Sequence, residues 1–271
     1  MTDIVFEKSS SALPSPWLEH LSPVQGHRLR MFCFPYAGGN AHVFRLWQRH
    51  YPANVGVCPV QLPGRGRRMN EPPFTRIKAL VKALADAVFS GSQAPFVFYG
   101  HSMGALISFE LARELRRRGL AGPRQLFLSG RRAPTVPDNE GPIFNLPHDQ
   151  FIAELKRLNG TPPELFELSE VTELFFPLLR ADFEMIDTYT YESEAPLSCP
   201  ITVYGGLQDE DVSPEALRDW KKQTTGTCEQ RLFPGNHFFI QDPKNEFHAA
   251  LRRDVMKAFQ SVNGDSRAHQ K

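Results

Sequence analysis

Short apolar runs alternate with amphipathic stretches along the 271-residue chain. Apolar runs of about four to eight residues that end near glycine or proline are typical of buried β-strands, because those two residues interrupt strand pairing. The runs are LRMFCFPY (29–36), VGVCPVQ (55–61), FVFYG (96–100), QLFLSG (125–130), PITVYGG (200–206) and EQRLFPG (229–235). We predict a β-strand at each of them.

Apolar residues recur at helical spacing between these runs. The first such stretch follows Thr75, which is a predicted N-cap. Its apolar face consists of Ile77, Leu80, Val81, Leu84 and Val88. Further stretches run from Met103 to about Arg118, through EALRDWKKQ after Pro214, and from about Glu246 to Val262. Strands that alternate with helices predict an α/β fold, in which a mostly parallel sheet carries helices on both faces.

The alternation stops from about residue 134 to residue 196. DQFIAELKRL and SEVTELFFPLLRADFEMIDTY are helical patterns in this segment, and both contain phenylalanine and leucine. We interpret the segment as a helical lid inserted over the sheet, with extra core helices as the alternative. Residues 263–271 are polar and aperiodic, which predicts a disordered tail. The chain is therefore expected to form a single domain over residues 1–271.

Composition and charge argue against several classes of function for this protein. The formal net charge is +1, which gives no electrostatic support for a nucleic-acid partner. The four cysteines lack the spacing of a metal site, disulfides are not expected, and no phosphate-loop or dinucleotide motif occurs. We predict no cofactor and no metal. The N-terminal segment does not resemble a signal peptide and no run is long enough to span a bilayer, so we expect a cytoplasmic protein without membrane contact.

The motif GHSMG, residues 100–104, stands where an apolar run ends and a helical pattern begins. Such a turn is sharp, and its two glycines leave room for it because a Cβ atom at either position would clash. The turn exposes the Ser102 hydroxyl at the carboxyl end of the sheet. It also places the Met103 amide at the positive end of a helix, where it can stabilise an oxyanion. We predict that Ser102 is a catalytic nucleophile, with an ordinary turn residue as the alternative.

A serine hydroxyl needs a base, and the base needs a carboxylate to fix its tautomer. His237, in FPGNHFF, follows a strand run and lies on a loop near the chain end, so we predict that it is the base. His101 adjoins Ser102, but adjacent side chains on a sharp turn point apart. The loop YGGLQDEDV (204–212) supplies the acid in the chain order of hydrolases with this turn. Asp209 is our choice and Asp211 is the alternative.

A second oxyanion donor is expected from the loop after the first strand. The stretch FPYAGGNAHVF (34–44) contains Gly38 and Gly39, which allow a close approach of the backbone. The Ala37 amide is the predicted donor beside that of Met103. A glycine turn without a catalytic role is the alternative.

Several motifs together resemble those of type II thioesterases, the discrete editing hydrolases of polyketide and nonribosomal-peptide assembly lines. These motifs are FPYAGG, LPGRGRR (62–68), GHSMGALISFELAR, LSGRRAP (128–134), LRADF (179–183), PITVYGG and PGNHFF. The resemblance covers roughly residues 30–260 and implies an α/β-hydrolase fold with a helical lid. Matched by motif, the family's serine–histidine–aspartate triad falls on Ser102, His237 and Asp209. Relatives often have Asp-Pro at the acid turn, whereas Glu210 follows Asp209 here.

The resemblance also implies a substrate and a partner. The substrate is an acyl group held as a thioester on the phosphopantetheine arm of an acyl or peptidyl carrier protein. Hydrolysis of stalled or wrongly loaded acyl groups restores the carrier's thiol during polyketide or nonribosomal-peptide (antibiotic) biosynthesis. One alternative is the similar medium-chain thioesterase that acts with vertebrate fatty-acid synthase. Others are a carboxylester hydrolase or acyltransferase on the same triad, and a carrier-binding protein that has lost catalysis.

Some charged residues of these motifs have no assigned part in the chemistry. They include Arg65, Arg67, Arg68, Arg131 and Arg132. Carrier proteins are generally acidic, so these arginines are interpreted either as a docking surface or as a solvated face. Asp182, in LRADF, is a candidate for lining the acyl channel together with the lid's phenylalanines, with simple packing as the alternative.

Overall fold

A six-stranded sheet forms the centre of the computed structural model, which describes residues 15–19, 28–89, 95–137, 141–160, 166 and 169–268. The strand order is β2-β1-β3-β4-β5-β6, and every neighbouring pair is parallel. The strands are β1 (Leu29–Phe34), β2 (Val55–Pro59), β3 (Phe96–His101), β4 (Leu126–Ser129), β5 (Ile201–Gly206) and β6 (Cys228–Phe233). All six predicted strands are present, and the mostly parallel α/β architecture is confirmed.

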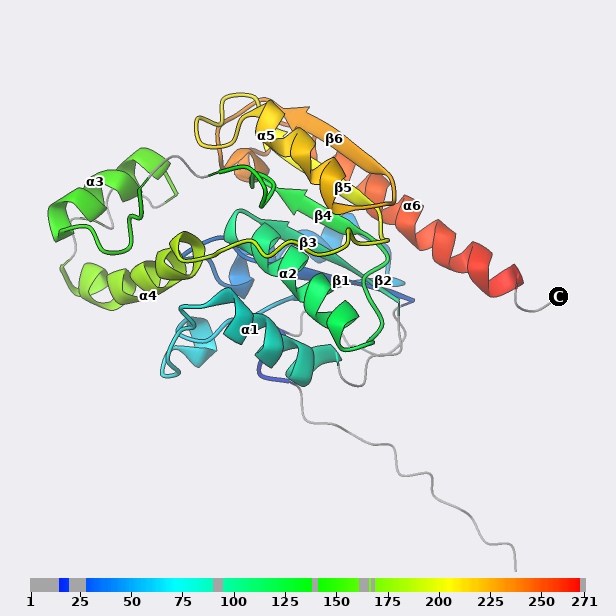
Figure 1. Ribbon diagram of the computed structural model, residues 1–271, viewed down its shortest axis with the longest axis horizontal. Helices are drawn as coiled ribbons and strands as arrows, with labels where there is room; N and C mark the ends of the chain where they lie inside the picture. The colour runs from blue at the N-terminus through cyan, green and yellow to red at the C-terminus, as the bar shows by residue number, and fades with distance from the viewer. Residues whose placement is uncertain are drawn as a thin grey trace, which may run out of the picture.

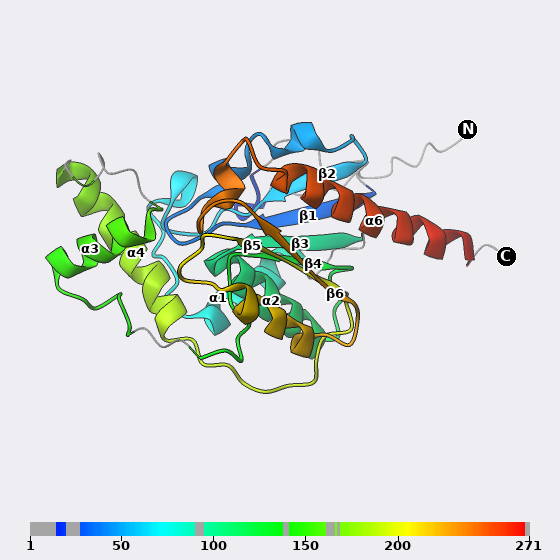
Figure 2. The same ribbon diagram turned by 90° about the horizontal axis from the view of Figure 1, so that it is seen from above.

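Helices cover both faces of this sheet (Figures 1 and 2). They are α1 (Ile77–Leu84), α2 (Met103–Arg117), α3 (His148–Leu158), α4 (Ser169–Asp187), α5 (Pro214–Arg218) and α6 (Phe247–Ala268). The face that carries α1, α2 and α5 buries Phe98 of β3, whereas the face that carries α6 buries the next residue, Tyr99. Because both faces are covered, β3 reads as a continuous apolar run. No helix among the described residues is long and apolar enough to cross a membrane.

Two helix ends differ from those expected. The N-cap predicted at Thr75 is wrong, since α1 begins at Ile77 and its N-cap is Arg76, whose side chain makes no capping bond. The buried apolar face, rather than a cap, stabilises this helix. The helix expected to end at about Val262 runs on to Ala268, where α6 ends; residues 269–271 lie outside the described residues, and the disorder predicted for residues 263–271 stays a prediction. Polar residues can extend a helix that has already formed, because only nucleation is costly.

The segment between β4 and β5 contains α3 and α4, which project from one end of the sheet (Figure 1). No strand occurs in the described part of this segment. The two helices share a small apolar cluster of their own, made of Phe151, Leu155, Phe176 and Leu179. The cluster is separate from the two layers that cover the sheet. This arrangement suits a lid, and the lid role itself stays a prediction.

The glycines of the GHSMG turn are required by close backbone contacts. A Cβ atom at Gly100 would lie 2.0 Å from the carbonyl oxygen of Gly104. A Cβ atom at Gly104 would lie 2.0 Å from the carbonyl oxygen of Phe34, although real Cβ atoms essentially never approach within 3.0 Å. Gly104 therefore lets the start of α2 contact the end of β1 directly.

We expect Gly104→Ala to lower the free energy of unfolding by more than about 3 kcal/mol, because a backbone carbonyl cannot move aside as a side chain can. Gly122→Ala is the control, since no atom lies within 4 Å of its Cβ position. This change is expected to alter stability by less than about 0.5 kcal/mol. Urea denaturation measures both values, and equal stabilities would show that the turn relaxes to admit a methyl group.

The four cysteines are free thiols, as expected. Cys33 and Cys58 are buried on the neighbouring strands β1 and β2. Burial raises the pKa of Cys58 to about 11, and that of Cys33 well above its ordinary value. Burial also raises the pKa of Cys199 to about 11 and raises that of Cys228. All four side chains are therefore protonated near neutral pH.

Candidate active site

Ser102 lies on the turn between β3 and α2 in a backbone conformation that side-chain-bearing residues rarely adopt. Its φ is 53° and its ψ is −114°, where steric clashes disfavour an L-residue. Its amide donates to the Ser129 carbonyl of β4 at 2.8 Å, and its carbonyl accepts from the Ala105 amide at 3.0 Å. The neighbouring strand and helix thus fix a strained residue at the carboxyl edge of the sheet, as a nucleophile turn requires.

His237 and Asp209 come together on the loops after β6 and β5. The Nδ1 atom of His237 lies 2.8 Å from Oδ2 of Asp209, and the two side chains are 13% and 0% exposed. Oδ1 of Asp209 accepts the amides of Asp211 and Val212 at 3.0 and 3.1 Å. These amides hold the carboxylate in place. A carboxylate at Nδ1 favours the proton on that nitrogen and leaves Nε2 free to act as a base.

Asp211, the alternative acid, binds a different partner. Its Oδ1 accepts from Nη1 of Arg157 on α3 at 2.6 Å, so it connects the acid loop to the projecting helices. Asp209, Asp211 and His237 could place ligand atoms within 4.8 Å of one another around a metal. The hydrogen bonds above account for this grouping, because each of the three side chains already binds a protein group.

The histidine loop packs against the residue that precedes Ser102. The rings of His237 and His101 have centroids 5.1 Å apart, and Nδ1 of His101 lies 3.0 Å from Oγ of Ser129. Burial, together with the nearby His237, lowers the pKa of His101 well below its ordinary value. A neutral imidazole, that of the last residue of β3, therefore packs against the His237 ring. Sequence reasoning set His101 aside, and only its position next to Ser102 could have indicated this contact.

The loop after β1, residues 35–41, reaches the same place. The contact between Gly104 and Phe34 brings the end of β1 against the first turn of α2. Met103 is the first residue of that helix, so its amide has no acceptor within the helix. The Ala37 amide lies on the adjoining loop. The structure thus brings the elements that carry Ala37, Ser102 and Met103 to one edge of the sheet, where the loops of Asp209 and His237 also end.

Comparison with known proteins identifies the family. The model of the thioesterase domain matches residues 29–254. The chain belongs to the thioesterase family. The gramicidin S biosynthesis protein GrsT of Aneurinibacillus migulanus is 41% identical over 230 residues, which cover 85% of this chain and 90% of the relative. The type II thioesterase BorB from the borrelidin biosynthetic cluster superposes with a TM-score of 0.79 at 30% identity, over 90% of this chain and 97% of that one.

One similar relative carries a different kind of name. The linear gramicidin dehydrogenase LgrE of Brevibacillus parabrevis is 42% identical over 254 residues, which cover 93% of this chain and 97% of the relative. The sequence of this thioesterase contains no G-x-G-x-x-G dinucleotide motif to match that name. Its fold is that of the α/β-hydrolases, as predicted, and the protein is a thioester hydrolase.

Two of the three arginines of the LPGRGRR motif are less accessible in this thioesterase than a docking surface requires, whereas Arg67 is 42% exposed. Arg65 is 4% exposed and forms an ion pair with Asp182. Arg68 is 7% exposed, pairs with Glu71 and lies 4.0 Å above the Trp17 ring. The docking interpretation is therefore wrong for Arg65 and Arg68. Asp182 is fully buried by its ion pair and does not line a channel, which corrects that expectation as well.

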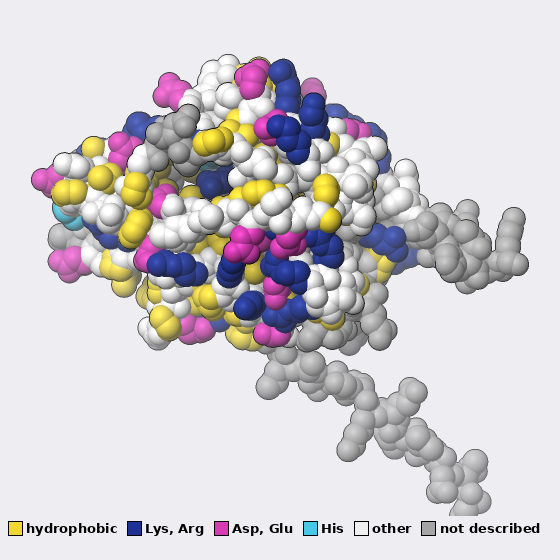
Figure 3. Space-filling model, in the orientation of Figure 1, with side chains coloured by type: hydrophobic (Ala, Val, Ile, Leu, Met, Phe, Trp, Pro, Cys, Tyr) yellow, Lys and Arg dark blue, Asp and Glu magenta, His cyan; other side chains and the backbone are white. Residues whose placement is uncertain are grey.

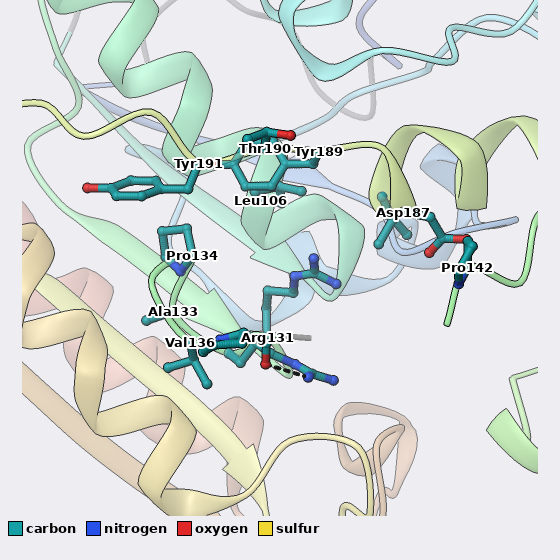
Figure 4. A pocket seen from close by; sticks show the side chains of 13 residues that line it. Leu106, Arg131, Ala133, Pro134, Val136, Pro142, Asp187, Tyr189, Thr190 and Tyr191 are labelled. Atoms are coloured by element: carbon teal, nitrogen blue, oxygen red, sulfur yellow. Dashed lines mark hydrogen bonds between the residues drawn. The ribbon is translucent and has the colours of Figure 1, made fainter. Parts of the chain in front are cut away.

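A cavity of about 380 Å³ opens near the turn of the thioesterase that carries Ser102. Its walls come from residues 131–137 after β4, residues 186–191 at the end of α4 and just beyond it, and Leu106, one helical turn after Ser102. Figure 4 shows Tyr189, Thr190 and Tyr191 on one side and Ala133, Pro134 and Val136 on another, with Arg131 near the centre of the view. Figure 3 shows the molecule hollowed where α3 and α4 meet the rest of the protein.

Another, more apolar cavity of about 570 Å³ lies beside the loop after β1. Its lining includes Gly38, Arg65, Met69, Leu174, Phe175 and Leu178. Gly38 of the loop after β1 and side chains of α4 therefore border the same cavity.

Proposed function

We propose that this thioesterase uses a Ser102–His237–Asp209 triad to hydrolyse acyl groups from the phosphopantetheine thiol of carrier proteins. Its biological task is to remove aberrant or stalled acyl units in polyketide or nonribosomal-peptide biosynthesis. The observation that carries the proposal is the 2.8 Å contact between His237 and the fully buried Asp209, beside the strained turn at Ser102. The relatives' roles in gramicidin S and borrelidin biosynthesis support the pathway class.

The chemistry proceeds in two steps. Nε2 of His237 takes the Ser102 proton as the hydroxyl oxygen attacks the thioester carbon, and Asp209 stabilises the resulting imidazolium. The Ala37 and Met103 amides donate to the oxyanion. Collapse breaks the carbon–sulfur bond, and the imidazolium gives its proton to the leaving sulfur, which leaves readily as the carrier's thiol because a thiol is more acidic than an alcohol. Neutral His237 then deprotonates a water that attacks the acyl-serine, and it returns this proton to the Ser102 oxygen as the free acid leaves.

The cavity beside Leu106 is our candidate for the acyl chain. It starts one helical turn beyond the nucleophile, and prolines, Val136 and Ile186 are among its lining residues. A volume of about 380 Å³ is within the range of small-molecule pockets, roughly 300–1,000 Å³. A short or medium acyl group therefore fits the space, which keeps the medium-chain fatty acyl thioesterase as a second candidate function.

Three substrates that share one acyl group test the proposal: the acyl-carrier protein, the acyl-pantetheine thioester and a simple oxygen ester. We expect kcat/KM to be highest for the carrier and at least about tenfold lower for the oxygen ester, because carrier binding and the thiol leaving group are both absent there. Release of free acid is followed by mass spectrometry. Preference for the oxygen ester would favour a carboxylester hydrolase. Transfer of the acyl group to an acceptor alcohol would favour an acyltransferase, and the absence of any turnover would favour a carrier-binding protein.

A further inference from the structure

Two motifs without a part in the chemistry, LPGRGRR and LRADF, meet at one buried ion pair. Arg65, on the loop after β2, donates from Nη1 to Oδ2 of Asp182 at 2.8 Å and from Nη2 to Oδ1 at 2.7 Å. Asp182 lies on α4, and the two side chains are 4% and 0% exposed. A two-bond pair of this kind fixes direction as well as distance.

The same two side chains bind the backbone of the oxyanion loop. The Gly38 amide donates to Oδ2 of Asp182 at 2.7 Å, and Nη1 of Arg65 donates to the Gly39 carbonyl at 3.1 Å. Packing adds to these bonds, since a Cβ atom at Gly38, whose φ is +74°, would lie 2.7 Å from Leu179 of α4. The loop is therefore held against α4 by both polar and apolar contacts.

These bonds account for three amides of the loop, and the Ala37 amide is not among them. The Gly38 amide binds Asp182, the Gly39 amide binds the Tyr36 carbonyl at 2.9 Å, and the Ala41 amide binds Oε1 of Gln61 at 3.2 Å. The Ala37 amide has no hydrogen-bond acceptor in the described part of the chain. It lies between the end of β1 and the bonded Gly38 amide, and it is available to a ligand.

We propose that Arg65 and Asp182 are positioning residues that direct the Ala37 amide toward the developing oxyanion. The inference rests on the proposed function, in which Ala37 and Met103 form the oxyanion hole. Because Asp182 belongs to α4, the amide is in place only while α4 is packed against the loop. Docking of this helix and assembly of the oxyanion hole are thus a single event.

The double variant Arg65→Gln/Asp182→Asn tests this without leaving one buried charge unpaired. Neutral amides cannot reproduce the two parallel bonds, so the loop loses its orientation. We expect kcat to fall about 10²-fold, as for the loss of one oxyanion donor, with KM changed less than about threefold. Arg68→Gln is the matched control, because Arg68 is buried on the same loop and pairs with Glu71. Its kcat is expected to stay within about twofold of the wild type.

An alkyl boronic acid provides a readout that a merely structural role would leave unchanged. It forms a tetrahedral anion on the serine oxygen, so its Ki reports on the oxyanion hole, as transition-state analogues do. We expect Ki to rise by about the factor by which kcat falls. A folded double variant that keeps both values within about threefold of the wild type overturns the inference. A rise in KM alone also overturns it, because the pair would then serve substrate binding.

A second variant tests the same inference if the double variant does not fold. Arg65→Lys keeps the buried charge pair but lacks the second donor arm, and we expect about a tenfold loss in kcat with a matching rise in Ki. All variants are assayed with whichever acyl ester the wild type hydrolyses best. A wild type that prefers oxygen esters therefore contradicts the proposed substrate class, whereas wild-type kcat and Ki in these variants contradict only the positioning role.

Discussion

Replacing Ser102 by alanine is expected to lower kcat for thioester hydrolysis by about 10⁴- to 10⁶-fold, to the residual rate that the oxyanion donors and substrate binding supply. The change removes only the hydroxyl oxygen. Alanine keeps the Cβ atom, so the strained φ of 53° is no harder to adopt than before. The fold and the substrate KM are therefore expected to persist, and steady-state kinetics on an acyl-carrier substrate measure the loss.

Ser108→Ala is the matched control for this change. Ser108 is buried on the same helix, and its hydroxyl donates to the Gly104 carbonyl at 2.8 Å. Loss of that bond is expected to cost about 0.5–1.5 kcal/mol of stability and to leave kcat within about twofold. A fluorophosphonate is expected to label Ser108→Ala but not Ser102→Ala. Normal turnover or labelling in Ser102→Ala would refute the nucleophile.

Asp209→Asn is expected to lower kcat by about 10⁴-fold with little change in the fold. An asparagine can keep its Oδ1 on the Asp211 and Val212 amides and turn its NH₂ group toward Nδ1 of His237. It then stabilises the tautomer whose proton is on Nε2, and His237 can no longer accept the proton of Ser102. The pH–rate profile and single-turnover acylation measure this effect on the chemical step.

Asp211→Asn is the control that distinguishes loss of the Asp209 carboxylate from a general disturbance of the loop that carries both aspartates. The carboxylate of Asp211 pairs with Arg157, and the two side chains are 15% and 37% exposed. Such a pair contributes about 0–1 kcal/mol, so we expect less than about a fivefold change in kcat. Equal losses in the two variants would contradict the assignment of the triad acid to Asp209.

The strands and the triad candidates could be predicted because both depend on local pattern. A strand that is buried on both faces is a continuous apolar run, and parallel pairing brings the carboxyl ends of the strands to one edge. Ser102, Asp209 and His237 each follow such a run within a few residues. They therefore share an edge whatever the order of the strands.

The sequence favours Asp209 but leaves Asp211 open as the alternative acid. Both lie on the same loop, two positions apart, and both are acidic. The decision depends on the loop backbone, whose amides at 211 and 212 bind Asp209, and on Arg157 of α3, which binds Asp211. Neither contact has a local sequence signal, because turn conformation and long-range packing determine them.

The burial of Arg65 and Arg68 also could not be predicted from the local sequence pattern. Arginines in a short polar stretch are usually solvated, and the alternation of apolar residues gives no sign of what covers them. Asp182 lies 117 residues after Arg65 in the chain. Only the packing of α4 over the loop after β2 brings the two side chains together. This contact buries the Arg65 charge, which the sequence offered as a candidate for docking.

The protonated thiols have a practical consequence for covalent probes. Alkylating agents react with thiolates, and all four cysteines have a raised pKa. Iodoacetamide therefore modifies the native enzyme slowly and the denatured chain quickly. Inactivation of the native enzyme by an acylating drug is accordingly not expected to come from a cysteine thiolate, and the slow reaction of Cys33 and Cys58 before denaturation reports on the burial of β1 and β2.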